Sequence, residues 1–402
     1  MTESPADKKT PYLSFILLAT LVSGLVSCSS ITQSPNDVRA RSLRDVPARS
    51  LAYRFEPDVG LPPGVRTEEA DDKIESILSD FATRRQDDAL VRTVRSPDGQ
   101  RALVLYGVAD QSSQEFRIDL YSSEGQFLRN LTPPELSCVF PETVAWSPDG
   151  NFITFIGHKT LQPTPTPTPA GAQPAEQIPE ASPLPSLAPA FPAVAVFSTE
   201  QIYICSRDGY DLKPLTAREG LIYFYAAWAP DNHALVAMAC KEAEWNARER
   251  DFKLPTGRPR LIAVDGKERL LDDESTEALP VWSPDSAKVA TGFDTDVMIY
   301  DAATEKPTQA RIRLREPLLA ASRAFAAKNS SPKEDNAQHG AENSVQDSGI
   351  PPSFNPIIRL EWTSPEKLFF QTAYVRVFPN EPISTFQRWH LVQLSPQAAL
   401  LK

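Results

Sequence analysis

Hydrophobic residues occur along the chain in short runs that are bounded by polar turn residues. Five of these runs follow a similar turn, and they read ALVLY (102–106), FITFI (152–156), ALVAMA (234–239), KVATGF (288–293) and KLFFQTAY (367–374). Their length and their content of β-branched and aromatic residues are typical of buried strands. A second strand-like segment follows each run, beginning at residues 116, 201, 260, 296 and 389. With one strand before the turn and a shorter one at the end, each unit is predicted to hold four strands.

The turn in front of each apolar run has a recurring motif. Its copies are RSPDG (95–99), WSPDG (146–150), WAPDN (228–232), WSPDS (282–286) and the degenerate WTSPE (362–366). Proline presets φ, aspartate and serine bond to nearby backbone, and glycine relieves the last position, which is the residue pattern of a type I turn. The tryptophan before the turn is large and flat enough to pack between neighbouring sheets. We therefore predict structural roles for Trp146, Pro148, Asp149, Gly150, Trp228, Pro230, Asp231, Trp282, Pro284 and Asp285.

These units resemble the propeller repeats of TolB and related bacterial WD-like proteins. In those repeats a Trp-Ser-Pro-Asp-Gly turn precedes an apolar strand, an IYxxD strand with a glycine turn, and a closing Leu-Thr. The second unit matches through WSPDG (146–150), IYI (202–204), Asp208-Gly209 and Leu215-Thr216, whereas Arg95 replaces the tryptophan in the first. The resemblance covers residues 90–402 apart from two insertions. It implies an all-β protein, a β-propeller of four-stranded blades, without the α/β domain of TolB.

The number of blades and the segment before them leave alternatives open. Five repeats are visible and related propellers often have six blades, so we expect six. Residues 52–60 are either a decayed sixth turn or a strand that closes the ring. Ile74, Ile77, Leu78 and Phe81 have the spacing of an amphipathic helix docked on the propeller. A second short helix is predicted at residues 318–327.

The first 30 residues have the pattern of an export signal. Two lysines precede an apolar run over residues 12–26, which is shorter than the roughly 20 residues of a membrane-spanning helix. Residues 25–28 read LVSC, which resembles the lipobox of bacterial lipoproteins, where cleavage precedes a cysteine that is then diacylated. The resemblance implies that Cys28 carries a lipid anchor. The alternative is an ordinary secretory signal, or an uncleaved anchor in which the cysteine is incidental. Ser29 follows it instead of aspartate, so we expect the outer membrane, facing the periplasm or the cell surface.

These features predict the organisation of the whole chain. Residues 1–27 are the lipoprotein signal peptide, 28–50 a flexible tether, 51–90 an N-terminal strand and helix segment, and 91–402 the propeller. Two insertions, near 161–195 and 317–356, are expected to be disordered, and the first holds ten prolines between positions 161 and 192. The 38 prolines of the chain, about twice the usual share against 16 glycines, are thereby divided between turns and this insertion.

Charge and the pattern of reactive residues limit the function. The net charge of −11 removes the electrostatic attraction on which nucleic-acid binding depends, so no nucleic acid is expected as a partner. The chain holds no GxSxG, HExxH, P-loop or GxGxxG motif, and no CxxC or His-Cys spacing for a metal. We expect no catalytic residues, cofactor or metal. Cys205 and Cys240 are read as small buried hydrophobic residues, and a disulfide among Cys138, Cys205 and Cys240 is the alternative. Each of the four histidines is read as solvated or on a strand surface.

The distribution of connections points to one surface. Connections between the first and second strands and between the third and fourth are short, whereas residues 158–200, 241–259, 316–356 and 376–388 all belong to the two classes that share the opposite face. Trp245 and Phe252 in residues 241–259 are candidate partner contacts, with packing onto their own blade as the alternative. We predict a lipid-anchored envelope propeller that binds envelope proteins. The alternatives are a hydrolase or lyase with a central-channel site and a small-ligand or metal sensor.

Overall fold

A computed structural model describes residues 47–65, 74–108, 115–159, 199–251, 253–304, 307–329, 356–376 and 384–395. All of them belong to one compact unit, residues 40–402. The predicted signal peptide, Cys28 and most of the tether lie outside these ranges, as do Phe252, the proline-rich insertion 161–195 and residues 330–355 of the second insertion. Residues 317–329 of that second insertion, which were expected to be disordered, are helical instead. Within the described ranges no helix is long and apolar enough to cross a membrane.

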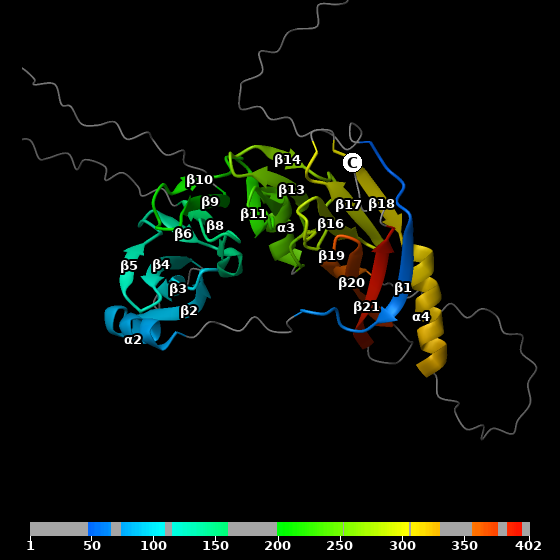
Figure 1. Cartoon of the computed structure of the whole chain (residues 1–402), viewed down its shortest axis with the longest axis horizontal. Coiled ribbons are helices and arrows are strands. Elements are labelled where there is room, and N and C mark those ends of the chain that lie inside the picture. Colours follow the sequence, from blue (N-terminus) through cyan, green and yellow to red (C-terminus); the bar gives the residue numbers. More distant parts are fainter. Residues whose placement is uncertain are drawn as a thin grey trace, which may run out of the picture. The chain divides into compact units, whose positions relative to one another are not determined.

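The strands form antiparallel sets of four in chain order, and we call each set a blade (Figure 1). Blade 1 holds β2 (Asp88–Arg95), β3 (Arg101–Val108), β4 (Phe116–Ser122) and β5 (Phe127–Asn130). Blade 2 holds β7 (Ala145–Trp146), β8 (Phe152–Lys159), β9 (Gln201–Ser206) and β10 (Lys213–Pro214). Blade 3 holds β11 (Leu221–Trp228), β12 (Ala234–Lys241), β13 (Arg258–Ala263) and β14 (Glu268–Leu270). Blade 4 holds β15 (Val281–Trp282), β16 (Lys288–Phe293), β17 (Asp296–Asp301) and β18 (Gln309–Arg313).

The last blade is completed by the N-terminal strand. It contains β19 (Ile357–Ser364), β20 (Lys367–Arg376) and β21 (Ser384–Leu394), and β1 (Tyr53–Val59) pairs antiparallel with β21. Residues 52–60 were predicted to be either a decayed sixth turn or a closing strand, and the structure shows a strand. The prediction of four-stranded propeller blades is confirmed. Five blades are found, and the described residues contain no sixth set of strands.

A short strand joins the first two blades. β6 (Leu136–Cys138) pairs with β4 on one side and with β8 on the other, which makes blades 1 and 2 parts of one nine-stranded sheet. The 3₁₀ turn η2 (Pro141–Thr143) follows it and leads into β7. This connection therefore bridges blades 1 and 2 before the chain enters β7, the first strand of blade 2.

In blades 1 to 4 the second strand is buried on both faces, which explains why its sequence is a continuous apolar run. In β12, Leu235 packs into a cluster with Ile202 of blade 2, whereas its neighbour Val236 packs with Val289 of blade 4. Successive strand residues point to opposite faces, so a blade with a neighbour on each side contributes to two interfaces. Similar clusters join blades 1 and 2 and blades 4 and 5.

The SPDG motif forms the connection between the first and second strands of every blade, as predicted. In blade 2 the Ser147 hydroxyl donates to Asp149 Oδ1, which also accepts the Asn151 amide at 3.1 Å, while Gly150 has a φ of 71°. Blades 1 and 4 repeat these hydrogen bonds. The bond from Ser96 is the main reason that the pKa of Asp98 is lowered to about 2. These aspartates bind their own turns, which is a structural role.

The tryptophans before the turns join neighbouring blades, which confirms their predicted packing. Trp146 Nε1 donates to Val94 O of blade 1 at 3.2 Å, and Trp282 Nε1 donates to Ala227 O of blade 3 at 3.1 Å. Trp228 Nε1 donates to Thr154 Oγ1 of blade 2 at 2.9 Å. The indole nitrogen of Trp362 is buried and has no hydrogen-bond partner among the described residues. Each tryptophan thus contacts the preceding blade, and the degenerate repeat lacks the polar part of this contact.

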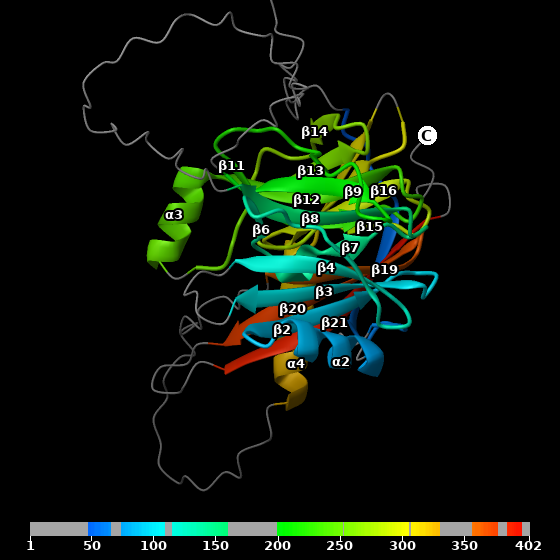
Figure 2. The same ribbon diagram turned by 90° about the vertical axis from the view of Figure 1, so that its left-hand side faces the viewer.

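Three α-helices accompany the blades in the described ranges. α2 (Glu75–Arg84) buries Ile77 and Phe81 against Tyr106 and Tyr121 of blade 1, which confirms the predicted amphipathic helix. α4 (Arg315–Asn329) includes the predicted helix 318–327 and lies beside β1 (Figure 1). α3 (Glu242–Asp251) follows β12 in a segment that the sequence analysis treated as a loop, and it lies next to β11 and β12 (Figure 2). Acidic residues in its first turn and arginines in its last favour this helix electrostatically.

Candidate functional site

A cavity of about 350 Å³ lies where three long-connection segments of blades 1 to 3 meet. Val139, Phe140 and Glu142 come from the connection between blades 1 and 2, and Glu200 comes from the end of the insertion in blade 2. Trp245, Arg248, Glu249 and Pro255 come from the α3 segment of blade 3, and Phe224 comes from β11. All these connections either join the second and third strands of one blade or join two successive blades, and these two classes share one face of the propeller. We call it the long-connection face. We call this cavity, with its nine lining residues, the Trp245 cavity.

Aromatic rings form one wall of the Trp245 cavity. The Trp245 ring lies 5.7 Å from the Phe140 ring in a T-shaped contact and 5.7 Å from the Phe224 ring in a tilted one. Beneath them, Ile222, Met238 and Cys240 form a small buried cluster that connects this wall to blade 3. Trp245 was predicted either to contact a partner or to pack onto its own blade. It packs onto blade 3, and it also lines a cavity. Phe252 lies outside the described residues.

An ion pair fixes the start of α3 and so the position of Trp245. The Arg258 guanidinium of β13 binds both carboxylate oxygens of Glu244, at 2.8 and 2.9 Å. Glu244 also accepts the backbone N–H of Lys241 at 2.9 Å. The hydrogen bond from Arg258 lowers the pKa of Glu244, so the carboxylate stays ionised. Because a bidentate pair of this kind restricts both side chains, the first turn of the helix is held on the sheet.

Acidic side chains surround the aromatic wall. Glu142, Glu200 and Glu249 line the Trp245 cavity, and the one basic lining residue is Arg248. Arg248 lies over the Trp245 ring, with its guanidinium carbon 3.9 Å from the ring centroid, and its Nη2 is 3.5 Å from Glu249 Oε1. Nδ1 of His158 is 3.8 Å from Glu200 Oε1. The arrangement is suited to contact with positive charge, and nothing in it resembles a nucleophile activated by a base.

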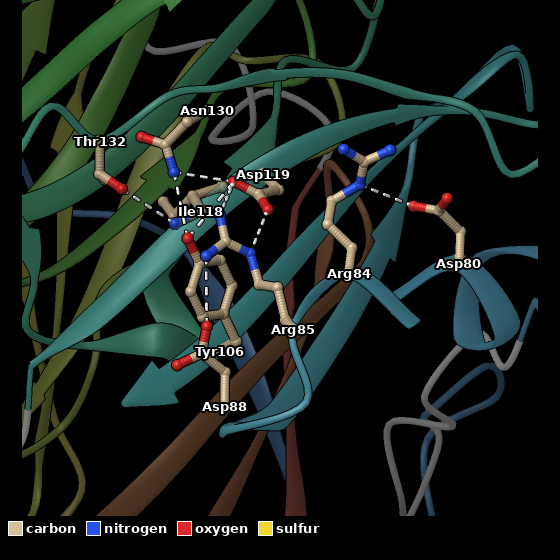
Figure 3. Close-up of polar contacts among 9 residues, drawn as sticks. All are labelled: Asp80, Arg84, Arg85, Asp88, Tyr106, Ile118, Asp119, Asn130 and Thr132. Carbon is tan, nitrogen blue, oxygen red and sulfur yellow. Dashed lines mark hydrogen bonds and ion pairs between the residues drawn. The ribbon is translucent and has the colours of Figure 1, made fainter. Parts of the chain in front are cut away.

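Buried charge elsewhere in the blades is neutralised inside the chain (Figure 3). Asp119 of β4 is fully buried and receives Arg85 Nε at 2.8 Å, Arg85 Nη2 at 3.2 Å and Asn130 Nδ2 at 2.7 Å. The Arg85 guanidinium also lies 4.0 Å from the centroid of the Tyr106 ring. Since Arg85 directly follows α2, this network attaches the helix to blade 1. The carboxylate has its hydrogen bonds filled by the protein, so its role is structural.

A second buried carboxylate has the same character. Glu268 of β14 is paired with Arg260 and with Arg218, whose Nε is 3.0 Å away, and it accepts the Tyr223 hydroxyl at 3.1 Å. Burial is the main cause that raises the pKa of Tyr223, so the hydroxyl keeps its proton and donates. Neither of these two carboxylates lines the Trp245 cavity or the second described cavity, which lies beside Asp272 and Arg311.

The histidines and cysteines are placed partly as expected. Cys138, Cys205 and Cys240 are buried and free, and burial raises the pKa of Cys240 to about 11. His233 is exposed beside its turn, as predicted. The expectation for His390 is wrong, because this residue of β21 is only 1% exposed and bonds Thr372 Oγ1 at 2.9 Å. In the ranges that the structure describes, no group of three histidine, cysteine or acidic side chains is arranged to hold a metal ion.

Sequence reasoning found part of this site. It identified the face and Trp245, but it missed Phe140, Glu142, Glu200 and Phe224. The last of these lies 84 positions after the first, and no local motif connects the four. The only local signal was the placement of acidic residues at the start of 242–251 and basic residues at its end. That signal indicates a helix and not a cavity.

The comparisons with known proteins give structural likeness only. No protein-family profile and no curated protein matches the chain. A prolyl oligopeptidase B from Galerina marginata, bound to a 25mer macrocyclization substrate, matches 85% of this chain and 40% of its own, with 10% identity and a TM-score of 0.41. A structure assigned as TolB from Agrobacterium tumefaciens matches 77% of this chain and 90% of its own, with 12% identity and a TM-score of 0.32. This chain spans about a third of the first solved structures that it matches.

Proposed function

We propose that the protein is a lipid-anchored β-propeller of the bacterial cell envelope that binds other proteins through its long-connection face. The observation that supports this function most is the Trp245 cavity, which is formed by segments of three blades on that face. Aromatic residues and arginine are enriched at the centres of protein interfaces, and this cavity has both in Trp245 and the Arg248 that lies over its ring. The anchor is inferred from LVSC at residues 25–28, with Cys28 as the acylated residue.

The first strands of the blades favour binding over catalysis. In a propeller these strands lie nearest the central axis, where a channel enzyme would place its reactive groups. The described first strands, β2, β7, β11, β15 and β19, contain two carboxylates, Asp88 and Glu361, and no histidine. Asp88 already pairs with Arg85 at 3.2 Å. Glu361 lies 4.0 Å from Arg359, so both carboxylates of these strands are paired with an arginine and neither is a free acid or base.

A crosslinking experiment tests the binding function. A photoreactive amino acid is placed at Leu254, which is 67% exposed and precedes the cavity residue Pro255, and irradiation is done in cells. We expect one discrete crosslinked protein. The matched control is Tyr210, which is 56% exposed in the turn between β9 and β10 on the opposite face, and which should give none. Equal crosslinking from both positions, or none from Leu254, would contradict the proposal.

The lipid anchor is tested separately. Cys28→Ala should abolish fatty-acid labelling and release the protein from membranes, because no other cysteine directly follows the apolar signal run. Cys138→Ala is the control and should leave labelling unchanged, since that thiol is buried. Continued labelling of the Cys28→Ala protein would show that the anchor assignment is wrong.

A further inference from the structure

The Trp245 cavity has a chemical preference that the proposed function does not specify. Its wall consists of three aromatic rings, and its rim carries three glutamates against one arginine. Aromatic faces are negatively polarised, so rings and carboxylates together favour a cation and disfavour an anion. Apolar ligands are a poorer fit, since insertion of an apolar group would desolvate the carboxylates without compensation.

Arg248 shows how a cation sits in this cavity. Its guanidinium stacks on Trp245 at 3.9 Å and approaches the Glu249 carboxylate at 3.5 Å. Arg248 Nε is buried and has no hydrogen-bond partner among the described residues. The cavity thus already contains one guanidinium that is bound by an aromatic ring and a carboxylate. The other two glutamates that line it, Glu142 and Glu200, take no part in this contact.

Glu142 and Glu200 are those remaining carboxylates. Glu142 is exposed, and the Arg92 guanidinium donates to its backbone carbonyl at 3.4 Å; no ion pair of the Glu142 carboxylate is found in the described ranges. Glu200 is half-buried, and among the described residues it pairs with the His158 imidazole, whose Nδ1 is 3.8 Å away. The described lining of the cavity therefore carries more negative than positive charge beside its aromatic wall, and the exposed Leu254 directly precedes the lining residue Pro255.

We infer that the Trp245 cavity binds a basic segment of a partner protein, in which one lysine or arginine side chain inserts between the aromatic wall and the carboxylates of Glu142 and Glu200. This inference rests on the proposed function and names the chemistry of its partner. The segment is a peptide and not a nucleic acid, because a net charge of −11 repels phosphate. Charge complementarity also accelerates the encounter of such a segment with this face.

Peptide titration tests this inference on the full chain in detergent. The probes are two acetylated, amidated pentapeptides, Gly-Arg-Lys-Arg-Gly and its acidic counterpart Gly-Glu-Asp-Glu-Gly, and binding is measured by isothermal calorimetry. We expect the basic peptide to bind, more weakly as salt is raised, and the acidic peptide not to bind. The Glu142→Gln, Glu200→Gln double variant should lose about tenfold in affinity, from two partly exposed ion pairs. Glu277→Gln, an exposed glutamate outside the cavity, should bind as the parent does.

The outcomes separate this inference from the proposed function. No binding of the basic peptide, equal binding of the acidic one, or unchanged affinity of the double variant would overturn the inference. If a protein is still crosslinked from Leu254, the face binds a partner of other chemistry and the proposed function stands. If Leu254 also fails to crosslink, both are wrong. The two glutamates lie at the surface of connections, so their replacement leaves the blades intact, and circular dichroism checks this.

Discussion

Acid should weaken the attachment of the N-terminal strand to the last blade through His390. This residue accepts the Asp58 N–H of β1 at Nδ1, at 3.3 Å, which leaves Nε2 protonated to donate to Thr372 Oγ1 at 2.9 Å. Arg388 lies two residues away on β21 and binds Asp58. Burial, aided by the charge of Arg388, lowers the pKa of His390 from 6.5 to about 4. Protonation would remove the acceptor of the Asp58 N–H, so the folded protein favours the neutral ring.

The sign and size of the effect follow from this pKa shift. Between pH 6.5 and about 4 the histidine is protonated in the unfolded chain but neutral in the folded one. The unfolded state binds more protons in this window, so the free energy of unfolding decreases as the pH falls. One pKa unit corresponds to about 1.4 kcal/mol, so the loss is about 2 kcal/mol at pH 5 and about 3 kcal/mol at pH 4.

Urea unfolding, followed by tryptophan fluorescence at pH 7 and pH 5, measures this effect. Glutamine does not titrate at this position. The free energy of unfolding should therefore fall by about 2 kcal/mol less from pH 7 to pH 5 in His390→Gln than in the parent, and this holds even if the substitution itself destabilises the protein at pH 7. His233→Gln is the control, because the side chain of His233 is 85% exposed. The same pH dependence in the parent and in His390→Gln would refute the reasoning.

Three further substitutions test the packing of the blades, each by urea unfolding. Trp282→Phe should destabilise by about 1 kcal/mol more than Trp362→Phe, because only the first loses a hydrogen bond; equal losses would contradict the link between blades. Gly209→Ala should lower the free energy of unfolding by well above 2 kcal/mol, since its Cβ would lie 2.2 Å from a leucine methyl. Gly220 has a similar φ and open space around it, so Gly220→Ala should lower it by about 1 kcal/mol. Similar losses in the two variants would argue against the contact at Gly209. Asp119→Asn should cost about 3 kcal/mol and speed hydrogen exchange in α2, and unchanged exchange would show that the pair does not hold the helix.

The blades were predictable because their signals are local. A proline, an aspartate and a glycine within five residues determine a turn, and the apolar run after it determines a strand, so no distant information is needed. β1 was harder, since YRFEPDV alternates only partly and its partner β21 lies at the other end of the chain. Its assignment depended on pairing, which a single sequence does not reveal.

The burial of His390 shows a different limit. In β21 the residues around it alternate between the two faces of the sheet, and a histidine at such a position is usually solvated. Two elements from elsewhere change this: β1 covers one edge of β21, and α4 provides Ser322 and the Ala321 carbonyl for Arg388 next to it. Burial here results from tertiary packing, so composition and periodicity could not predict it.

The face opposite the long-connection face carries the short turns, and we call it the short-turn face. On it, residues that depart from the SPDG motif form hydrogen bonds between blades. Where blade 2 has Gly150, blades 3 and 4 have Asn232 and Ser286, and both adopt positive φ, of 68° and 57°. Asn232 Oδ1 accepts the Asp149 amide of the preceding blade at 2.9 Å, and Ser286 Oγ accepts the Asp231 amide at 3.0 Å. A strained backbone is thus offset by a hydrogen bond between blades, which glycine cannot make.

This bonding constrains one face of the blades and leaves the other free to differ. On the short-turn face, Arg207 also pairs with Asp98 at 2.6 Å across blades 1 and 2, so a change in one turn affects the adjacent blade. On the long-connection face, segments such as α3 are held by contacts of their own, as Glu244 is by Arg258. Insertions there cost little in blade packing. Connections of different blades can therefore vary more freely on that face, where they form the Trp245 cavity.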